Sequence, residues 1–332
     1  MKIVIIGGSG FVGTCLIDSL VMLSDVELVN IDIKMSLKYP ALTVQGDIMD
    51  YALLKEQFKG ADWVVLLAAE HRDDVKPVQK YYDVNVEGMR NTLRAMENAG
   101  VKKILFTSSV AVYGLNKNNP SEISLVDPFN DYGKSKFKAE QALNAWYRRN
   151  PGGTAQVIRP TVIFGEGNRG NVFNLLKQIA SGRFLMIGSG TNVKSMSYVG
   201  NVVAFIQYLI SVNDSGYQIY NYSDTPDFST NSLVQYTGEV LGKRGPAIRI
   251  PYILGLLGGY GFDVLAFLTR KKLSISSVRV RKFCATTKFN SSKMLCSGFK
   301  PPYTLEEGLR TMLLAEFGSD RLAQEDISSL RK

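Results

Sequence analysis

Short apolar runs alternate with longer segments of helical spacing through the first half of the chain. The apolar runs occupy residues 2–6, 26–32, 42–45, 63–69, 103–109 and 155–159. The segments of helical spacing occupy residues 12–23, 82–99 and 132–149. Strands that alternate with helices in this way are typical of βαβ units, which build a parallel sheet. The pattern predicts an α/β fold with a Rossmann-type, doubly wound parallel sheet.

The alternation loosens after residue 160. Glycine-punctuated loops at 165–170 and 182–190 flank a helical segment at 171–180, and residues 219–221 return to the sheet. We therefore expect two domains and a polar tail. Their expected bounds are 1–165 for the Rossmann domain, to which 193–222 return, 166–192 and 223–318 for a smaller mixed α/β substrate lobe, and 319–332 for the tail.

Composition narrows the class of protein. Of 332 residues, 45% are apolar and 10% are aromatic, which excludes a disordered chain and supplies a sizeable core. Three cysteines without a C-x-x-C pair, together with one histidine, assemble neither a disulfide framework nor a Cys/His zinc site, so we expect no metal. Only four apolar residues separate Lys2 from Gly7, too few for a signal peptide, and we expect a cytoplasmic protein.

The positive charge is local. Residues 241–300 hold twelve Lys and Arg and one acid, a charge of +11 within a chain of +9, and they include the cluster Arg270, Lys271 and Lys272. The same segment contains the most apolar stretch of the protein, residues 250–268, in which Pro251, four glycines and Asp263 disfavour a bilayer span. Two interpretations stay open: a buried part of the smaller lobe, or an apolar surface in peripheral contact with an anionic membrane. No nucleic-acid recognition motif accompanies the basic residues.

A glycine turn follows the first expected strand and opens the first helix. Gly7, Gly10 and Gly13, with Phe11 and Val12 between them, have the spacing of a turn that receives a dinucleotide pyrophosphate at a helix N-terminus. Asp32 closes the second strand, where an acid accepts hydrogen bonds from a ribose 2′-hydroxyl and repels a 2′-phosphate, so NAD is favoured over NADP. The alternative is a tight turn and an unrelated surface acid. Further expected cofactor contacts are Asp47 and Ile48 at the adenine, and Leu67, Ala68 and Ala69 along the middle of the cofactor.

A tyrosine and a lysine four residues apart follow a serine-rich strand end. Tyr132 and Lys136 share one face of a helix, so the ammonium can lower the pKa of the phenol and make it a general base. A hydroxyl from Ser109 can hold the same substrate oxygen. Tyr-x-x-x-Lys alone occurs often by chance, but the glycine turn and Asp32 make chance a poor explanation here.

These motifs, with Asn85 and the Arg159-Pro160 pair, resemble the extended short-chain dehydrogenase/reductase superfamily of sugar-nucleotide epimerases and dehydratases over about 310 residues. The resemblance implies that Tyr132 is the proton acceptor, that Lys136 tunes it and binds the nicotinamide ribose, and that Ser109, rather than Ser108, is the third member. It also implies that Asn85 and Pro160 support the cofactor. Two motifs depart from the superfamily: Val162 replaces a common asparagine, and Lys194-Ser195 replaces an Arg-Asp pair. The substrate contacts expected on this basis are Ser109, Tyr132, Asn171, Lys194, Arg279 and Arg281.

Residues 67–74, 159–171 and 276–287 resemble one enterobacterial O-antigen subfamily more closely. The resemblance implies 4-epimerisation of GlcNAc-diphospho-undecaprenol to the GalNAc lipid through a transient 4-keto sugar, at the inner face of the cytoplasmic membrane. Three alternatives stay open: a soluble UDP-GlcNAc/UDP-GalNAc 4-epimerase, an NAD(P)H-dependent reductase of nucleotide-linked 4-keto-6-deoxysugars, and a non-catalytic dinucleotide-binding protein. A homodimer is also left open by the sequence.

Overall fold

The structure is a computed structural model that describes residues 1–72, 75–115, 117–182, 184–212, 215–243, 248–269 and 276–318. The chain divides into two compact units, which we describe separately. The first unit comprises Met1–Ile163, Val199–Ser223 and Phe289–Pro302, and the second comprises Phe164–Tyr198, Asp224–Lys288 and Tyr303–Lys332. Arg270, Lys271, Lys272 and the expected tail at 319–332 lie outside the described residues.

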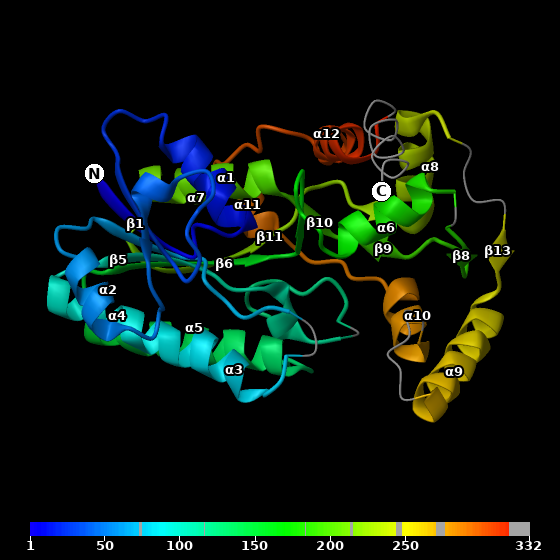
Figure 1. Ribbon diagram of the computed structural model, residues 1–332, viewed down its shortest axis with the longest axis horizontal. Helices are drawn as coiled ribbons and strands as arrows, with labels where there is room; N and C mark the ends of the chain where they lie inside the picture. The colour runs from blue at the N-terminus through cyan, green and yellow to red at the C-terminus, as the bar shows by residue number, and fades with distance from the viewer. Residues whose placement is uncertain are drawn as a thin grey trace, which may run out of the picture. The chain divides into compact units, whose positions relative to one another are not determined.

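A seven-stranded parallel sheet forms the centre of the first unit (Figure 1), in the order β11-β6-β5-β4-β1-β2-β3. The strands are β1 (Lys2–Ile6), β2 (Glu27–Asp32), β3 (Thr43–Gln45), β4 (Trp63–Leu66), β5 (Lys103–Thr107), β6 (Thr154–Pro160) and β11 (Gly216–Tyr222). Val4 of the central strand β1 is in register with Val29 of β2 and Val64 of β4. The predicted Rossmann-type α/β fold is confirmed.

Helices cover both faces of this sheet (Figure 1). One face carries α1 (Phe11–Leu20) and α7 (Val199–Val212). The other carries α2 (Tyr51–Gln57), α3 (Gln79–Tyr82), a π-helical turn (Asp83–Glu87), α4 (Gly88–Ala99) and α5 (Asp131–Arg149). Because both faces are covered, the central strands are apolar throughout rather than alternating. Their core residues Val4, Ile6, Val64, Leu66, Ile104 and Phe106 are at most 2% exposed.

Two strands end earlier than the apolar pattern predicts. β4 stops at Leu66 and β5 at Thr107, two or three residues before their apolar runs end. After β4, the amides of Leu67 and Ala68 both donate to the carbonyl of Ile6, which turns the chain out of the sheet. The residues after each strand end are therefore loop residues at the carboxyl edge of the sheet, where open α/β sheets bind ligands.

The boundaries of the units differ from the expected domain bounds in two places. Residues 193–198 belong to the second unit, because β9 (Val193–Lys194) pairs with β12 (Phe228–Ser229) and the amide of Tyr198 donates to Asp224. The segment Phe289–Pro302 belongs to the first unit, where its Phe299 ring packs against Phe205 and Tyr222. Both differences arise from contacts between residues far apart in the sequence, which the spacing of apolar residues does not predict.

The second unit has a helical part and a helical hairpin. The helical part consists of three helices that pack together: α6 (Asn171–Ala180), α8 (Thr230–Leu241) and α12 (Leu305–Phe317). The hairpin is formed by α9 (Tyr252–Thr269) and α10 (Ser277–Cys284), and a short parallel pair, β8 (Met186–Ile187) with β13 (Arg249–Ile250), adjoins it (Figure 1). Among the described residues, α9 alone is long and apolar enough to cross a membrane, judged by length and composition.

Candidate active site

The glycine turn of the first unit has the shape of a dinucleotide cradle. Gly7 has φ +91°, and a Cβ there would lie 2.5 Å from the amide nitrogen of Ala68. A Cβ on Gly13 would lie 2.4 Å from the Cα of Gly8, so only glycine lets α1 approach the turn this closely. Gly10 is the N-cap of α1 and offers no side chain to its first amides. These amides, at the positive end of the helix dipole, suit a pyrophosphate.

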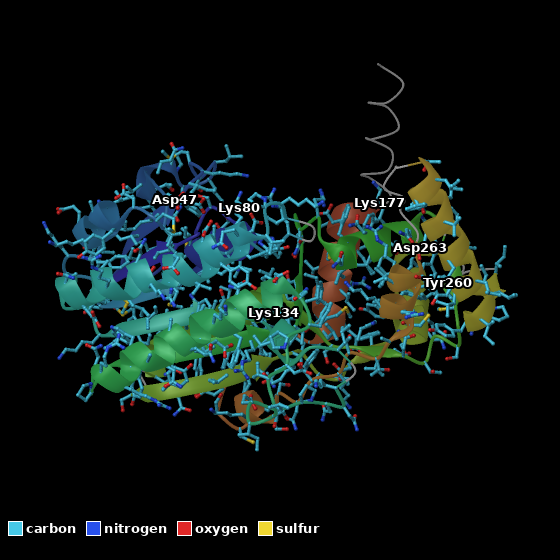
Figure 2. The ribbon with its side chains drawn as sticks, turned by 90° about the horizontal axis from the view of Figure 1, so that it is seen from below. Asp47, Lys80, Lys134, Lys177, Tyr260 and Asp263 are labelled. Carbon is cyan, nitrogen blue, oxygen red and sulfur yellow. The ribbon has the colours of Figure 1, made fainter. Side chains whose placement is uncertain are left out.

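Asp32 stands at the end of β2, beside this turn. Its carboxylate accepts hydrogen bonds from the backbone amides of Ser9 and Lys34, both at 3.0 Å. The acid therefore links the glycine turn to the residues after β2 and places negative charge beside the turn. Its expected role, to accept from a ribose hydroxyl and to repel a phosphate, stays a prediction. Asp47 is exposed (Figure 2), whereas Ile48 is buried against Gly88, the first residue of α4.

Asn85 fixes the loop that follows β4. Its amide oxygen accepts from the backbone nitrogen of Glu70 at 2.9 Å, and its amide nitrogen donates to the Glu70 carbonyl and to the Ser135 hydroxyl. Asn85 lies in the π-helical turn of residues 83–87, a backbone irregularity that is frequent at functional sites. This one side chain thus links the expected cofactor loop to the helix that carries Tyr132.

An ion-pair cluster holds the same loop from its outer side. The Glu70 carboxylate accepts from Arg72 at 2.8 Å and lies 3.5 Å from the ammonium of Lys80, labelled in Figure 2. The hydrogen bonds from Arg72 lower the pKa of Glu70 to about 2. The hydroxyl of Tyr81 donates to the Arg72 carbonyl at 2.5 Å, and its ring lies 6.5 Å from that of Tyr132.

The structure separates the two serines that follow β5. The hydroxyl of Ser109 accepts from the amide of Ala111. It also lowers the pKa of the Tyr132 phenol. Ser108 is 4% exposed and donates instead to the buried carboxylate of Glu140. The geometry favours Ser109 over Ser108 as the third member of the site, although its catalytic role stays a prediction.

Lys136 lies inside the first unit rather than at its surface. It is 2% exposed, and its Nζ donates to the carbonyl of Thr107 at 2.8 Å. Lys134, two positions away on α5, is exposed and points outward (Figure 2), so helical phase selects which lysine faces the sheet. Burial lowers the pKa of Lys136 to about 7, opposed by the nearby charge of Glu140.

The pKa of Tyr132 differs from the sequence expectation. Burial raises this pKa and the nearby Tyr81 raises it further, while Ser109 lowers it. The helix spacing predicted a pKa lowered by the Lys136 ammonium, but that ammonium donates its hydrogen bond to Thr107. The role of Tyr132 as a general base stays a prediction.

A buried polar network adjoins Lys136 and was not predicted from the sequence. Glu140 lies one helical turn after Lys136, 2% exposed, and accepts from Arg159 Nε at 2.9 Å and Nη2 at 2.5 Å. Arg159 also donates to the hydroxyl of Tyr113, which donates to Asn221 of β11. The signal in the sequence was the regular spacing of Tyr132, Lys136 and Glu140 at four-residue intervals on one helix face.

The expected substrate contacts other than Ser109 and Tyr132 belong to the second unit. Asn171 is exposed at the start of α6, and Arg279 and Arg281 are exposed on α10. Lys194 has hydrogen-bond partners at the end of α10: its Nζ donates to the carbonyls of Lys282 at 2.9 Å and Ala285 at 2.5 Å. Burial lowers the pKa of Lys194 to about 8. A substrate-binding role for these four residues stays a prediction.

Comparisons with known proteins agree with this geometry. The profile of the NAD dependent epimerase/dehydratase family matches residues 3–222, and the chain belongs to this family, whose cofactor is NAD. A relative from Escherichia coli O157:H7, named N-acetyl-alpha-D-glucosaminyl-diphospho-ditrans,octacis-undecaprenol 4-epimerase, is 55% identical over 317 residues, 95% of each chain. The UDP-glucose 4-epimerase of Vibrio cholerae is 30% identical over 93% of each chain. The solved structure of a Thermotoga maritima UDP-glucose 4-epimerase with UDP-glucose has a TM-score of 0.75 at 22% identity, covering 98% of this chain and 100% of that one, which shows the shared fold.

Proposed function

We propose that this protein is an NAD-dependent 4-epimerase that converts GlcNAc-diphospho-undecaprenol to GalNAc-diphospho-undecaprenol. One observation carries the proposal: Tyr132, whose pKa Ser109 lowers and which lies four residues from the buried Lys136, belongs to a chain 55% identical to an epimerase named for that substrate. The alignment covers 95% of both chains, so it extends into the second unit as well as across the first.

Tyr132 moves the proton in this reaction. Its phenolate takes the proton of the sugar 4-hydroxyl as C4 is oxidised, and the phenol returns it when C4 is reduced. Ser109 lowers the pKa of the phenol and so favours the phenolate. The transient 4-keto sugar must present the opposite face of C4 for reduction, because hydride return to the original face would restore the original epimer.

Lys136 and Glu140 set the charge beneath the tyrosine. Glu140 raises the pKa of Lys136 against the lowering effect of burial, which keeps part of the lysine protonated near neutral pH. An ammonium close to Tyr132 favours the phenolate. When bound, NAD supplies the reversible hydride acceptor for C4 and a second positive charge. Since the reaction has no net redox change, one tightly held NAD serves for many turnovers.

A UDP-linked sugar is the second candidate substrate. The 30% identity to the UDP-glucose 4-epimerase of Vibrio cholerae supports it, and the residues of the first unit suit either substrate because they act only on the sugar ring. Location separates the two candidates. A polyprenyl tail stays in the bilayer, since each buried CH₂ is worth about 0.8 kcal/mol, so an enzyme for the lipid-linked sugar must work at the membrane. We therefore propose a peripheral location at the inner face of the cytoplasmic membrane.

Direct assay of both substrates tests the proposal. Purified protein is incubated with detergent-solubilised GlcNAc-diphospho-undecaprenol and, separately, with UDP-GlcNAc, and the epimer ratio is measured. We expect conversion of the lipid-linked sugar without added nicotinamide. Efficient conversion of UDP-GlcNAc alone would assign the soluble epimerase, and sustained NADH consumption with a nucleotide-linked 4-keto-6-deoxysugar would assign the reductase.

Removing the phenol tests the role of Tyr132. In Tyr132→Phe the ring and its packing stay, so the fold and NAD content should persist while turnover falls by about 10²–10⁴-fold. Phe137→Leu, a change of a half-buried residue on the same helix, is a control for local packing. Turnover of Tyr132→Phe within a few-fold of the wild type would remove Tyr132 from this role.

A further inference from the structure

Helix α9 packs against the second unit through its smallest side chains. Gly259 is its only buried residue, and a Cβ there would lie 2.8 Å from the Cα of Ser277 on α10. A Cβ on Gly255 would lie 2.4 Å from the side chain of Ile187. Asp263 accepts from the amide of Ser277 at 3.2 Å. These positions are four residues apart, so a strip of two glycines and one acid forms the protein-facing side of the helix.

The opposite side of α9 is a continuous apolar surface. At about 100° per residue, six large apolar side chains fall within roughly 120° of arc. All six are 46–72% exposed: Ile253, Leu254, Leu257, Val264, Leu265 and Leu268. The one other position within that arc is Gly261, so the surface carries no polar or charged side chain. We call these six residues the outer face of α9.

This arrangement is the reverse of that expected for a core helix. A helix at the edge of a water-soluble core points its leucines inward and its polar side chains outward. In α9 the acid faces the protein and the leucines face away from it, as the labelled Asp263 in Figure 2 illustrates. Contiguous exposed apolar surfaces of this kind mark contacts with a membrane or another protein.

The charge of helix α10 favours a membrane over another protein as the partner of this surface. Arg279, Arg281 and Lys282 are exposed on α10, whose sequence contains no acid. Arg281 also lies over the ring of Tyr260, 5.6 Å from its centroid, so basic charge adjoins α9 itself (Figure 2 labels Tyr260). Residues 241–300 carry +11 in total, and two copies of this surface would repel each other. An anionic lipid surface is attracted by the same charge.

We propose that the outer face of α9, with the basic residues of α10 beside it, inserts into one leaflet of an anionic bilayer with the helix parallel to the membrane plane. Asp263, bonded to the amide of Ser277, and the close packing of Gly259 hold one side of α9 against protein, so only the other side meets lipid. That a bilayer, rather than another partner, covers this surface rests on the proposed lipid-linked substrate. The existence of the apolar surface and its outward orientation rest on contacts within the second unit.

Co-sedimentation with vesicles tests this inference. The wild type should pellet with vesicles that contain phosphatidylglycerol, and less so with phosphatidylcholine alone or at 1 M salt, where the Debye length is about 3 Å. Leu257→Gln/Leu268→Gln should reduce partitioning by at least ten-fold, as expected when apolar burial is lost. The matched control is Ile123→Gln/Leu125→Gln, which changes two apolar residues outside α9 that are even more exposed, at 97% and 80%, and should pellet like the wild type.

A second measurement reports the depth of the helix. Trp63 and Trp146 are both buried, so Phe267→Trp, at a position 82% exposed, adds a tryptophan at the surface. Its fluorescence should be quenched by lipids brominated near the headgroup and little by lipids brominated near the bilayer centre. Stronger quenching by the lipids brominated near the bilayer centre would contradict the shallow, in-plane position.

The two proposals fail in distinguishable ways. If the inference holds, Leu257→Gln/Leu268→Gln converts detergent-solubilised substrate as the wild type does while losing vesicle binding. If the wild type does not pellet with anionic vesicles, or the variant pellets equally well, the inference is wrong whatever the activity. Loss of a dimer in the variant, without vesicle binding by the wild type, would assign the surface to a second copy. Vesicle binding without turnover of the lipid-linked sugar would overturn only the proposed function.

Discussion

Helix α5 of the first unit buries charged side chains, whereas helix α9 of the second unit exposes leucines. Lys136 and Glu140 of α5 are each 2% exposed, while Leu257 and Leu268 of α9 are 60% and 72% exposed. Both helices invert the usual distribution of polar and apolar side chains. The buried charges of α5 have partners within the unit, namely Thr107, Ser108 and Arg159.

The two helices depart in different ways from the usual pattern of buried apolar and exposed polar side chains. In α5 the buried charges are satisfied within the chain, because each one is hydrogen-bonded to residues of the first unit. In α9 the exposed leucines can be buried only against something outside the chain, which we propose to be a membrane. The energetic consequences of substitutions in the two helices should therefore differ, and each of the following changes tests that difference.

The largest expected effect follows from removing the charge of Glu140. Glu140→Gln leaves the Arg159 guanidinium buried without its anion, and breaking a buried pair in this way costs about 3–5 kcal/mol of unfolding free energy. Urea denaturation measures the loss. Glu87→Gln is the control, because the Glu87–Arg90 pair is exposed and is worth less than about 1 kcal/mol. Equal losses in the two variants would show that burial of the α5 network is energetically unimportant.

The same substitution in the two helices should have unequal effects. Leu143→Ala in α5 removes a side chain that is 0% exposed and should cost about 2–5 kcal/mol. Leu257→Ala in α9 removes one that is 60% exposed and should change the unfolding free energy by less than about 0.5 kcal/mol without lipid. Urea denaturation in the absence of vesicles compares them. A large loss in Leu257→Ala would mean that the outer face of α9 is covered by protein.

Two adjacent glycines of α9 sharpen its orientation. Gly259→Ala places a Cβ 2.8 Å from the Cα of Ser277, so α9 must shift and the cost should be about 1–3 kcal/mol. Gly258→Ala meets nothing within 4 Å and should stabilise the helix by up to about 1 kcal/mol, because alanine favours helix. The two urea midpoints should therefore move in opposite directions. Movement in the same direction would contradict the packing of Gly259 on α10.

The most gradual effect is a dependence of stability on pH, which accumulates over several pH units. Burial lowers the pKa of Lys136 to about 7 in the folded protein, against 10.5 when unperturbed, so between these values the unfolded chain binds more protons. Unfolding free energy should therefore rise with pH across this window, by at most about 1.4 kcal/mol per pH unit. Lys136→Met lacks this contribution. The difference between wild type and variant, followed by urea denaturation from pH 7 to 10, should grow, and a constant difference would show that Lys136 keeps its proton in the folded state.

The sequence by itself determined the architecture of the first unit. Apolar runs alternating with helical segments predict the parallel sheet, because strands covered on both faces are apolar throughout. The turn at Gly7, Gly10 and Gly13 predicts the NAD site, because a left-handed φ and close backbone approach both demand glycine. The spacing of Tyr132 and Lys136 places both on one helix face, which is a local property of any helix.

Only the tertiary structure decided which partners these residues have. The partner of Ser108 and the Glu140–Arg159–Tyr113–Asn221 network depend on residues up to 108 positions apart, which no local pattern brings together. The same holds for the pKa of Tyr132, which burial raises although the helix spacing alone predicted a lowered value. From the sequence alone, residues 250–268 could form either a buried part of the smaller lobe or an exposed apolar surface. The contacts of Gly255, Gly259 and Asp263 decided that the leucines face outward, because hydropathy measures how apolar a helix is and not which side of it is covered.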